Sequence, residues 1–217
     1  MERSHNHNWI ARVVGGLFFL STFSYMFGNG MVTIPADADA LLYAAAHGNQ
    51  MIAGVLLQLV NSAAVVAMGV LLFVAIKPAS EATALGYAGA RLIEGLLLAL
   101  GGIATLVLVG LAPITPPNAG AEAMVNGLQL GSRIAYHCGM LALGIGSIPF
   151  CWVLFRTRMI PRGLAILGVV GYLSLALGSG LELYGINLNL LHNIPGGIFE
   201  LILPIWLLVR GFQAQPV

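Results

Sequence analysis

The chain has 217 residues, of which 59% are hydrophobic and only 8% are charged, with a formal net charge of +1. Soluble domains carry about 25% charged residues, so this composition excludes an ordinary soluble enzyme, and the length suits a single domain. The chain has no basic stripe that would neutralise phosphates, so we expect no nucleic-acid partner.

The first hydrophobic stretch covers residues 12–34. It follows residues 1–11, which we expect to form a disordered cytoplasmic tail. Arg3 and Arg12 precede the apolar run at 13–26 and small residues follow it at 36–40, a pattern that also suits a cleaved signal peptide. We interpret the stretch as the first membrane helix.

Five further apolar stretches follow, each near the ~20 residues that cross a ~30 Å hydrocarbon core. They cover residues 50–76, 84–112, 128–155, 163–181 and 193–209. Prolines and charged residues separate them, such as Lys77 and Pro78 after the second stretch and Arg158 after the fourth. The sequence therefore predicts an all-α bundle of six transmembrane helices, with one domain over residues 1–217.

The basic residues outside the spans or at their cytoplasmic edges predict an orientation in the membrane. They all fall on one side, and they are Arg3, Arg12, Lys77, Arg156, Arg158, Arg162 and Arg210. The loops on the opposite side contain Asp37, Asp39 and Glu122 and no Lys or Arg outside the span edges. By the positive-inside rule we expect both termini to be cytoplasmic and the bilayer to be the main partner of the chain.

The chain has 28 glycines, many of them within the predicted spans. Helices in lipid associate through close backbone contact at small residues. Pairs such as Gly15 with Gly16 and Gly178 with Gly180 therefore predict closely packed helices.

Seven ionisable side chains lie in or beside the spans, where a charge near the bilayer centre costs at least ~2.5–3.5 kcal/mol unless it is paired or solvated. They are Arg91, Glu94, Arg133, His137, Glu182, His192 and Glu200. Because ionisable residues in a membrane mark functional sites by default, these residues predict a polar pocket inside the bundle.

The spacing of polar residues predicts the floor of this pocket. Tyr87, Arg91 and Glu94 follow an i, i+4, i+7 pattern on one face of the third span. At ~1.5 Å of rise per residue, Glu200 in the sixth span reaches a similar depth. We predict that these four residues, with Asn61 of the second span, bind a small molecule or an ion.

Arg133 and Tyr136 share a face of the fourth span nearer the outer surface, and we add them to the predicted ligand-binding residues. The cavity is therefore expected to open outward. A transport protein or a binding protein is the function that these residues favour.

Two other functions stay open. His137 and His192, with Glu182, are candidate ligands for a transition metal or a b-type haem, which would make the protein a membrane enzyme. No HExxH or similar spacing enforces such a site. Alternatively, Arg91 pairs only with its neighbouring carboxylates, and the protein is a structural or accessory membrane subunit.

Four segments carry a family resemblance. They are GARLIEG at 89–95, RIAYHCG at 133–139, FRTRMIPRGLAILGVVGYL at 155–173 and PGGIFELILPIWLLVRG at 195–211. The chain from residue 12 to residue 211 resembles the bacterial membrane proteins grouped as domain of unknown function 4386. The resemblance implies a six-span protein of the bacterial inner membrane with polar positions like Arg91, Glu94, His137 and Glu200, and it implies no activity.

Overall fold

The computed structural model describes residues 2–115, 118–189 and 191–213, with side chains from residue 8 onward. The elements in these ranges are α1 (Glu2–Val32), α2 (Ala40–Ile76), α3 (Glu81–Leu111), α4 (Ala119–Thr157), α5 (Arg162–Leu183), the 3-10 turn η1 (Leu191–Asn193) and α6 (Ile194–Val209). Six helices are long and apolar enough to cross a membrane. The predicted all-α fold with six such helices is confirmed.

Two helices begin earlier than the hydrophobic stretches that predicted them. α2 begins at residue 40 instead of 50, and α4 begins at residue 119 instead of 128. Polar caps explain both starts, because the side chains of Asp39 and Asn118 accept hydrogen bonds from the first-turn amides of Leu42 (3.0 Å) and Ala121 (2.9 Å). The hydropathy pattern detects the apolar part of each helix, and the caps set where the helix starts.

The first helix also differs from the prediction at its start. α1 begins at Glu2, so the segment that was predicted to be a disordered tail continues the helix. Within α2, His47 has a non-helical backbone (φ −115°, ψ 19°), which kinks the helix close to the predicted start of the second span.

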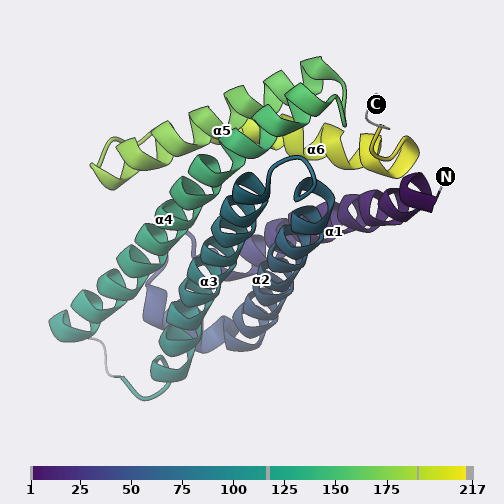
Figure 1. Ribbon diagram of the computed structural model, residues 1–217. Helices are drawn as coiled ribbons and strands as arrows, with labels where there is room; N and C mark the ends of the chain where they lie inside the picture. The colour runs from purple at the N-terminus through teal and green to yellow at the C-terminus, as the bar shows by residue number, and fades with distance from the viewer. Residues whose placement is uncertain (1, 116–117, 190, 214–217) are drawn as a thin grey trace.

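The six helices form a closed ring. Each helix packs against the next one in the chain, and α6 packs against α1. Figure 1 shows α2, α3 and α4 running side by side, with α5 and α6 inclined to them. A glycine permits a close approach at every contact around the ring: Gly28 (α1–α2), Gly95 (α2–α3), Gly146 (α3–α4), Gly144 (α4–α5), Gly171 (α5–α6) and Gly15 (α6–α1). The predicted close packing at glycines is confirmed at these positions and at Gly178, whereas a Cβ at Gly16 or Gly180 would meet no atom within 4 Å.

Both termini lie at the same end of the ring (Figure 1). The amide of Gln213 donates a hydrogen bond to the carbonyl of Met159 in the α4–α5 turn (2.9 Å), and Gly211 lies against Asn8. We call this the basic end, because the helix ends and turns here carry Arg12, Lys77, Arg156, Arg158, Arg162 and Arg210. The side chain of Arg3 lies outside the described side chains. The C-terminal ends of α1, α3 and α5 lie at the opposite end, which we call the far end.

The distribution of side chains is reversed relative to a soluble protein. Large apolar side chains such as Leu96, Ile145 and Leu177 are exposed on the outside of the ring, whereas Arg91 and Glu94 are buried inside it. Soluble domains almost never bury such charges unless they are paired. The ring therefore presents an apolar outer surface, as expected of a bundle that crosses a membrane, and encloses Arg91 and Glu94.

Candidate functional site

The interior of the ring is organised around Arg91 of α3, of which only 2% is exposed. Its Nε donates to the hydroxyl of Tyr87 (2.8 Å), and its Nη1 donates to Oε2 of Glu94 (3.0 Å). Its Nη2 lies 3.4 Å from the hydroxyl oxygen of Tyr172 and 3.3 Å from Oε1 of Glu200. All three guanidinium nitrogens are therefore engaged, and the planar fork joins α3 to α5 and α6.

Local packing holds the guanidinium in this position. Gly69 of α2 leaves room for the base of the Arg91 side chain, because a Cβ at residue 69 would lie 2.8 Å from the Cβ of Arg91. The ring of Phe18 in α1 lies 5.5 Å from the Arg91 Cζ, and the ring of Tyr87 lies 5.3 Å from it. These aromatic faces add cation–π attraction to the hydrogen bonds.

Glu200 of α6 completes the group, which we call the ion cluster (Arg91, Glu94 and Glu200). Its Oε1 accepts a second hydrogen bond, from the hydroxyl of Tyr172 (2.8 Å). The side chain of Glu200 is 30% exposed, compared with 5% for that of Glu94. Glu200 is therefore the member of the ion cluster that is most accessible from the space around it.

That space is a cavity of about 190 Å³, which we call the inner cavity. The whole ion cluster lines it, as do Asn61 and Tyr172. Asn61 accepts a hydrogen bond from the hydroxyl of Ser21 (2.5 Å) on the α1 side of the cavity. The rest of the lining is mostly apolar or aromatic, which is typical of small-molecule sites.

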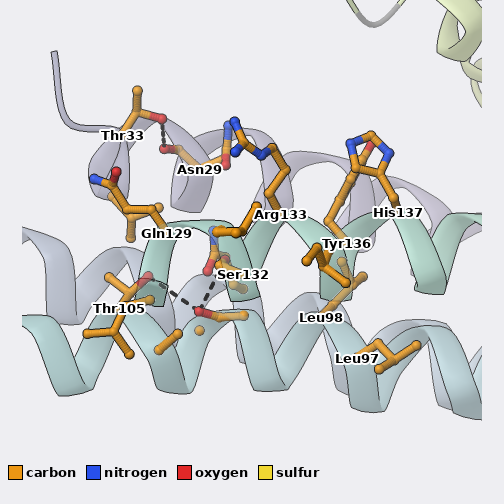
Figure 2. Close-up of a pocket in the computed structure, with 18 of the residues that line it drawn as sticks. Asn29, Thr33, Leu97, Leu98, Thr105, Gln129, Ser132, Arg133, Tyr136 and His137 are labelled. Atoms are coloured by element: carbon orange, nitrogen blue, oxygen red, sulfur yellow. Dashed lines mark hydrogen bonds between the residues drawn. The ribbon is translucent and has the colours of Figure 1, made fainter. Parts of the chain in front are cut away.

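A larger hollow of about 1200 Å³ lies towards the far end, and we call it the outer hollow. Figure 2 shows Arg133, Tyr136 and His137 of α4 lining it, with the side chain of Arg133 reaching towards Asn29 of α1. Arg133 and Glu182 carry opposite charges on its lining. The outer hollow therefore carries no strong net charge from this pair.

The two spaces share four lining residues: Tyr25, Leu98, Tyr136 and Asn193. The rings of Tyr25 and Tyr136 stack with their centroids 6.3 Å apart, and Nδ2 of Asn193 donates to the Tyr136 hydroxyl (3.0 Å). Side chains from α1, α4 and η1 thus lie where the outer hollow meets the inner cavity. We call Tyr25, Tyr136 and Asn193 the tyrosine gate.

The two predicted metal-binding histidines are neighbours. The ring centroids of His137 and His192 lie 6.3 Å apart, and each residue is 6% exposed. Nδ1 of His137 and both ring nitrogens of His192 are buried without a hydrogen-bond partner. His192 sits against Gly178, where any Cβ would overlap its ring.

Glu182 has a different partner, since its Oε1 accepts a hydrogen bond from the amide of Leu188 (2.6 Å) in the loop before η1. Among the residues described from 8 to 213, no group of three or more His, Cys, Asp and Glu side chains is arranged to hold a metal ion. Metal binding by the two histidines stays a prediction.

The structure thus brings the predicted ligand-binding residues into two connected groups. Tyr87 and Asn61 lie with the ion cluster, and Arg133 and Tyr136 lie in the outer hollow. Sequence reasoning missed Tyr172, which hydrogen-bonds two members of the ion cluster. The sequence did contain a signal, which is a tyrosine in an apolar span without charged residues. A buried hydroxyl needs a hydrogen-bond partner, so Tyr172 was a candidate to contact polar residues of other spans.

Comparison with known proteins adds a family and no activity. The model of the family described as Domain of unknown function (DUF4386) matches residues 13–211. Searches of curated proteins and of solved structures gave no match.

Proposed function

Because the chain belongs to the DUF4386 family, whose description assigns no function, we propose a function from its own geometry. The protein is a six-span protein of the bacterial inner membrane that binds or transports a small ligand or ion. The ligand enters from the outer side through the outer hollow and binds beside the ion cluster in the inner cavity.

One observation carries this proposal: a buried ion cluster lines a cavity instead of being packed on all sides. A cluster that served only helix packing has no need of space beside it. Here Glu200 is 30% exposed and faces about 190 Å³ of space. Charged groups at this depth in a membrane typically mark a substrate or ion pathway.

The orientation follows from the charges at the two ends. The basic end carries Arg12, Lys77, Arg156 and Arg210, which favours a cytoplasmic location for that end and for both termini. The outer hollow is lined by the far halves of α1, α3 and α4, so it opens to the outer side in this orientation. The tyrosine gate lies between that opening and the ion cluster.

The test is the effect of ligands on folded protein purified in lipid nanodiscs. A solute that binds the native state raises the midpoint of thermal unfolding. Without solute, we expect the midpoint of thermal unfolding of Glu200→Gln to stay close to that of the unaltered protein. With solute, we expect the increase in this midpoint to be lost in the variant. Glu122→Gln is the matched control, because Glu122 is exposed at the start of α4 and lines neither cavity.

This experiment also separates the ligand-binding function from a structural role. Removing one partner of a buried ion pair costs ~3–5 kcal/mol when the pair stabilises the fold. If Glu200→Gln loses folded protein in the absence of any solute, and no solute stabilises the unaltered protein, the ion cluster serves helix packing and the proposed function is wrong.

A second candidate is a metal-dependent membrane enzyme that uses His137 and His192. The observation that favours it is the set of three buried ring nitrogens without partners, because neutral imidazole nitrogens are common metal ligands. Elemental analysis and an absorption spectrum of the purified protein test this candidate. Absence of both a transition metal and haem after purification without chelators would retire it.

A further inference from the structure

We infer that the ligand of the inner cavity is a small organic ammonium ion, whose positive charge lies against Glu94 and Glu200. This inference rests on the proposed binding function and names the chemical class of the ligand.

The lining of the inner cavity carries more carboxylates than cationic groups. Among the described residues, the ionisable Asp, Glu, Lys, Arg and His side chains that line it are Arg91, Glu94 and Glu200. The single guanidinium pairs with both carboxylates. With both carboxylates ionised, one negative charge is left over inside the ring, and an unbalanced charge in a medium of low dielectric constant is costly. A cation in the cavity removes that cost, whereas an anion adds to it.

The carboxylates of Glu94 and Glu200 also offer hydrogen-bond acceptors to a ligand. Arg91 donates to Oε2 of Glu94, and Arg91 and Tyr172 donate to Oε1 of Glu200. Within the described part of the chain, the other oxygen of each carboxylate accepts no hydrogen bond. Glu94 is only 4% exposed and lines the cavity, so a donor that reaches its free oxygen has to come from within the cavity. An ammonium group supplies several N–H donors and matches acceptors that have none.

The rest of the lining suits an organic ammonium ion better than a metal cation. Hard cations such as Ca²⁺ take six to eight oxygen ligands, and the remaining lining is mainly apolar. It includes Phe18, Met68, Leu143 and Leu175, together with the ring of Tyr25. Apolar and aromatic surfaces suit the carbon skeleton of an amine, and aromatic rings also attract its charge. A volume of about 190 Å³ holds roughly six liquid waters, so several non-hydrogen atoms fit.

The experiment uses three solutes of similar shape and different charge. The full chain in nanodiscs is heated with n-butylammonium chloride, sodium butyrate or 1-butanol, and with sodium chloride at equal ionic strength. We expect n-butylammonium alone to raise the unfolding midpoint in a saturable manner. Glu200→Gln is expected to weaken its apparent affinity by about tenfold or more, because truncating one partner of a buried charge pair costs at least that much. Glu122→Gln is expected to leave the affinity unchanged.

Other outcomes would overturn the inference in distinguishable ways. Stabilisation by butyrate or butanol that depends on Glu200 would show a ligand of another class and leave the proposed function standing. Equal stabilisation by sodium chloride would show an inorganic cation. A midpoint that rises at lower pH, with no further effect of n-butylammonium, would show that a proton balances the ion cluster. If no solute of any charge acts, both the inference and the proposed function fail. The comparison of n-butylammonium, butyrate and butanol on the unaltered protein tests the inference even if Glu200→Gln does not fold.

Discussion

Oε1 of Glu200 lies 2.8 Å from the hydroxyl oxygen of Tyr172, and this contact joins α6 to α5 inside the ring. The same carboxylate oxygen accepts from Nη2 of Arg91 at 3.3 Å, so one atom ties three helices together. The arrangement fixes the position of Oε1 of Glu200, which lines the inner cavity, and uses none of the hydrogen-bonding capacity of the second oxygen. Positioning of the carboxylate therefore depends on a hydroxyl group that carries no charge.

Tyr172→Phe tests this dependence. The variant keeps the ring and removes the hydroxyl that contacts both Arg91 and Glu200. We expect a loss of about 1–3 kcal/mol in the free energy of unfolding, because Oε1 of Glu200 loses the closer of its two donors. The measurement is denaturant unfolding in mixed micelles. Tyr184→Phe is the matched control, since Tyr184 is 88% exposed in the loop after α5, and a similar loss in both variants would contradict the account.

Arg91→Met tests whether the guanidinium balances the two carboxylates. The substitution leaves Glu94 and Glu200 without their cation, and we expect a loss of about 3–5 kcal/mol in stability. Replacing both glutamates by Gln in the same chain is expected to recover most of that loss, because the buried negative charges disappear. If the triple variant is as unstable as the single one, the guanidinium acts through packing and not through charge.

Gly171→Ala tests the packing that sets the distance between Tyr172 and Glu200. A Cβ at residue 171 would lie 2.8 Å from the Cα of Gly196 and 2.9 Å from its amide nitrogen. Because these are backbone atoms, α6 must shift, and we expect a loss of about 1–3 kcal/mol in stability from the overpacking. Weaker binding of n-butylammonium should accompany it. Gly163→Ala on the same helix meets no atom within 4 Å and is expected to have little effect.

Gly178→Ala tests the seat of the buried histidine pair. Any Cβ there overlaps the ring of His192, which must move away from its position beside His137. We expect a similar loss of stability, about 1–3 kcal/mol, with binding in the inner cavity retained. Gly180→Ala is the control two residues away, since a Cβ there meets no atom within 4 Å. Equal stability of the two variants would show that His192 is not held where the structure places it.

Much of the fold was predictable because a membrane imposes simple length and hydropathy rules on helices. The six helices and the shared face of Tyr87, Arg91 and Glu94 follow from those rules and from helical periodicity. The early start of α2 was not predictable from hydropathy, because the capping side chain of Asp39 sets it.

The contents of the site were less predictable than the helices. Helical periodicity gives the face of one helix and says nothing about which face of another helix meets it. Tyr172 and Gly69 join Arg91 through contacts between distant parts of the chain, and each is a common residue type in a membrane helix. Only the packing of the ring brings them together.

The central claim is that the ion cluster forms a ligand site that is reached from the outer hollow. The most direct test is a high-resolution structure of the protein in lipid nanodiscs, determined with and without n-butylammonium. The account predicts non-protein density in the inner cavity, within hydrogen-bond distance of Glu94 and Glu200, that appears with the amine. An inner cavity closed by side chains or filled by lipid, with no density beside these carboxylates in either structure, would contradict it.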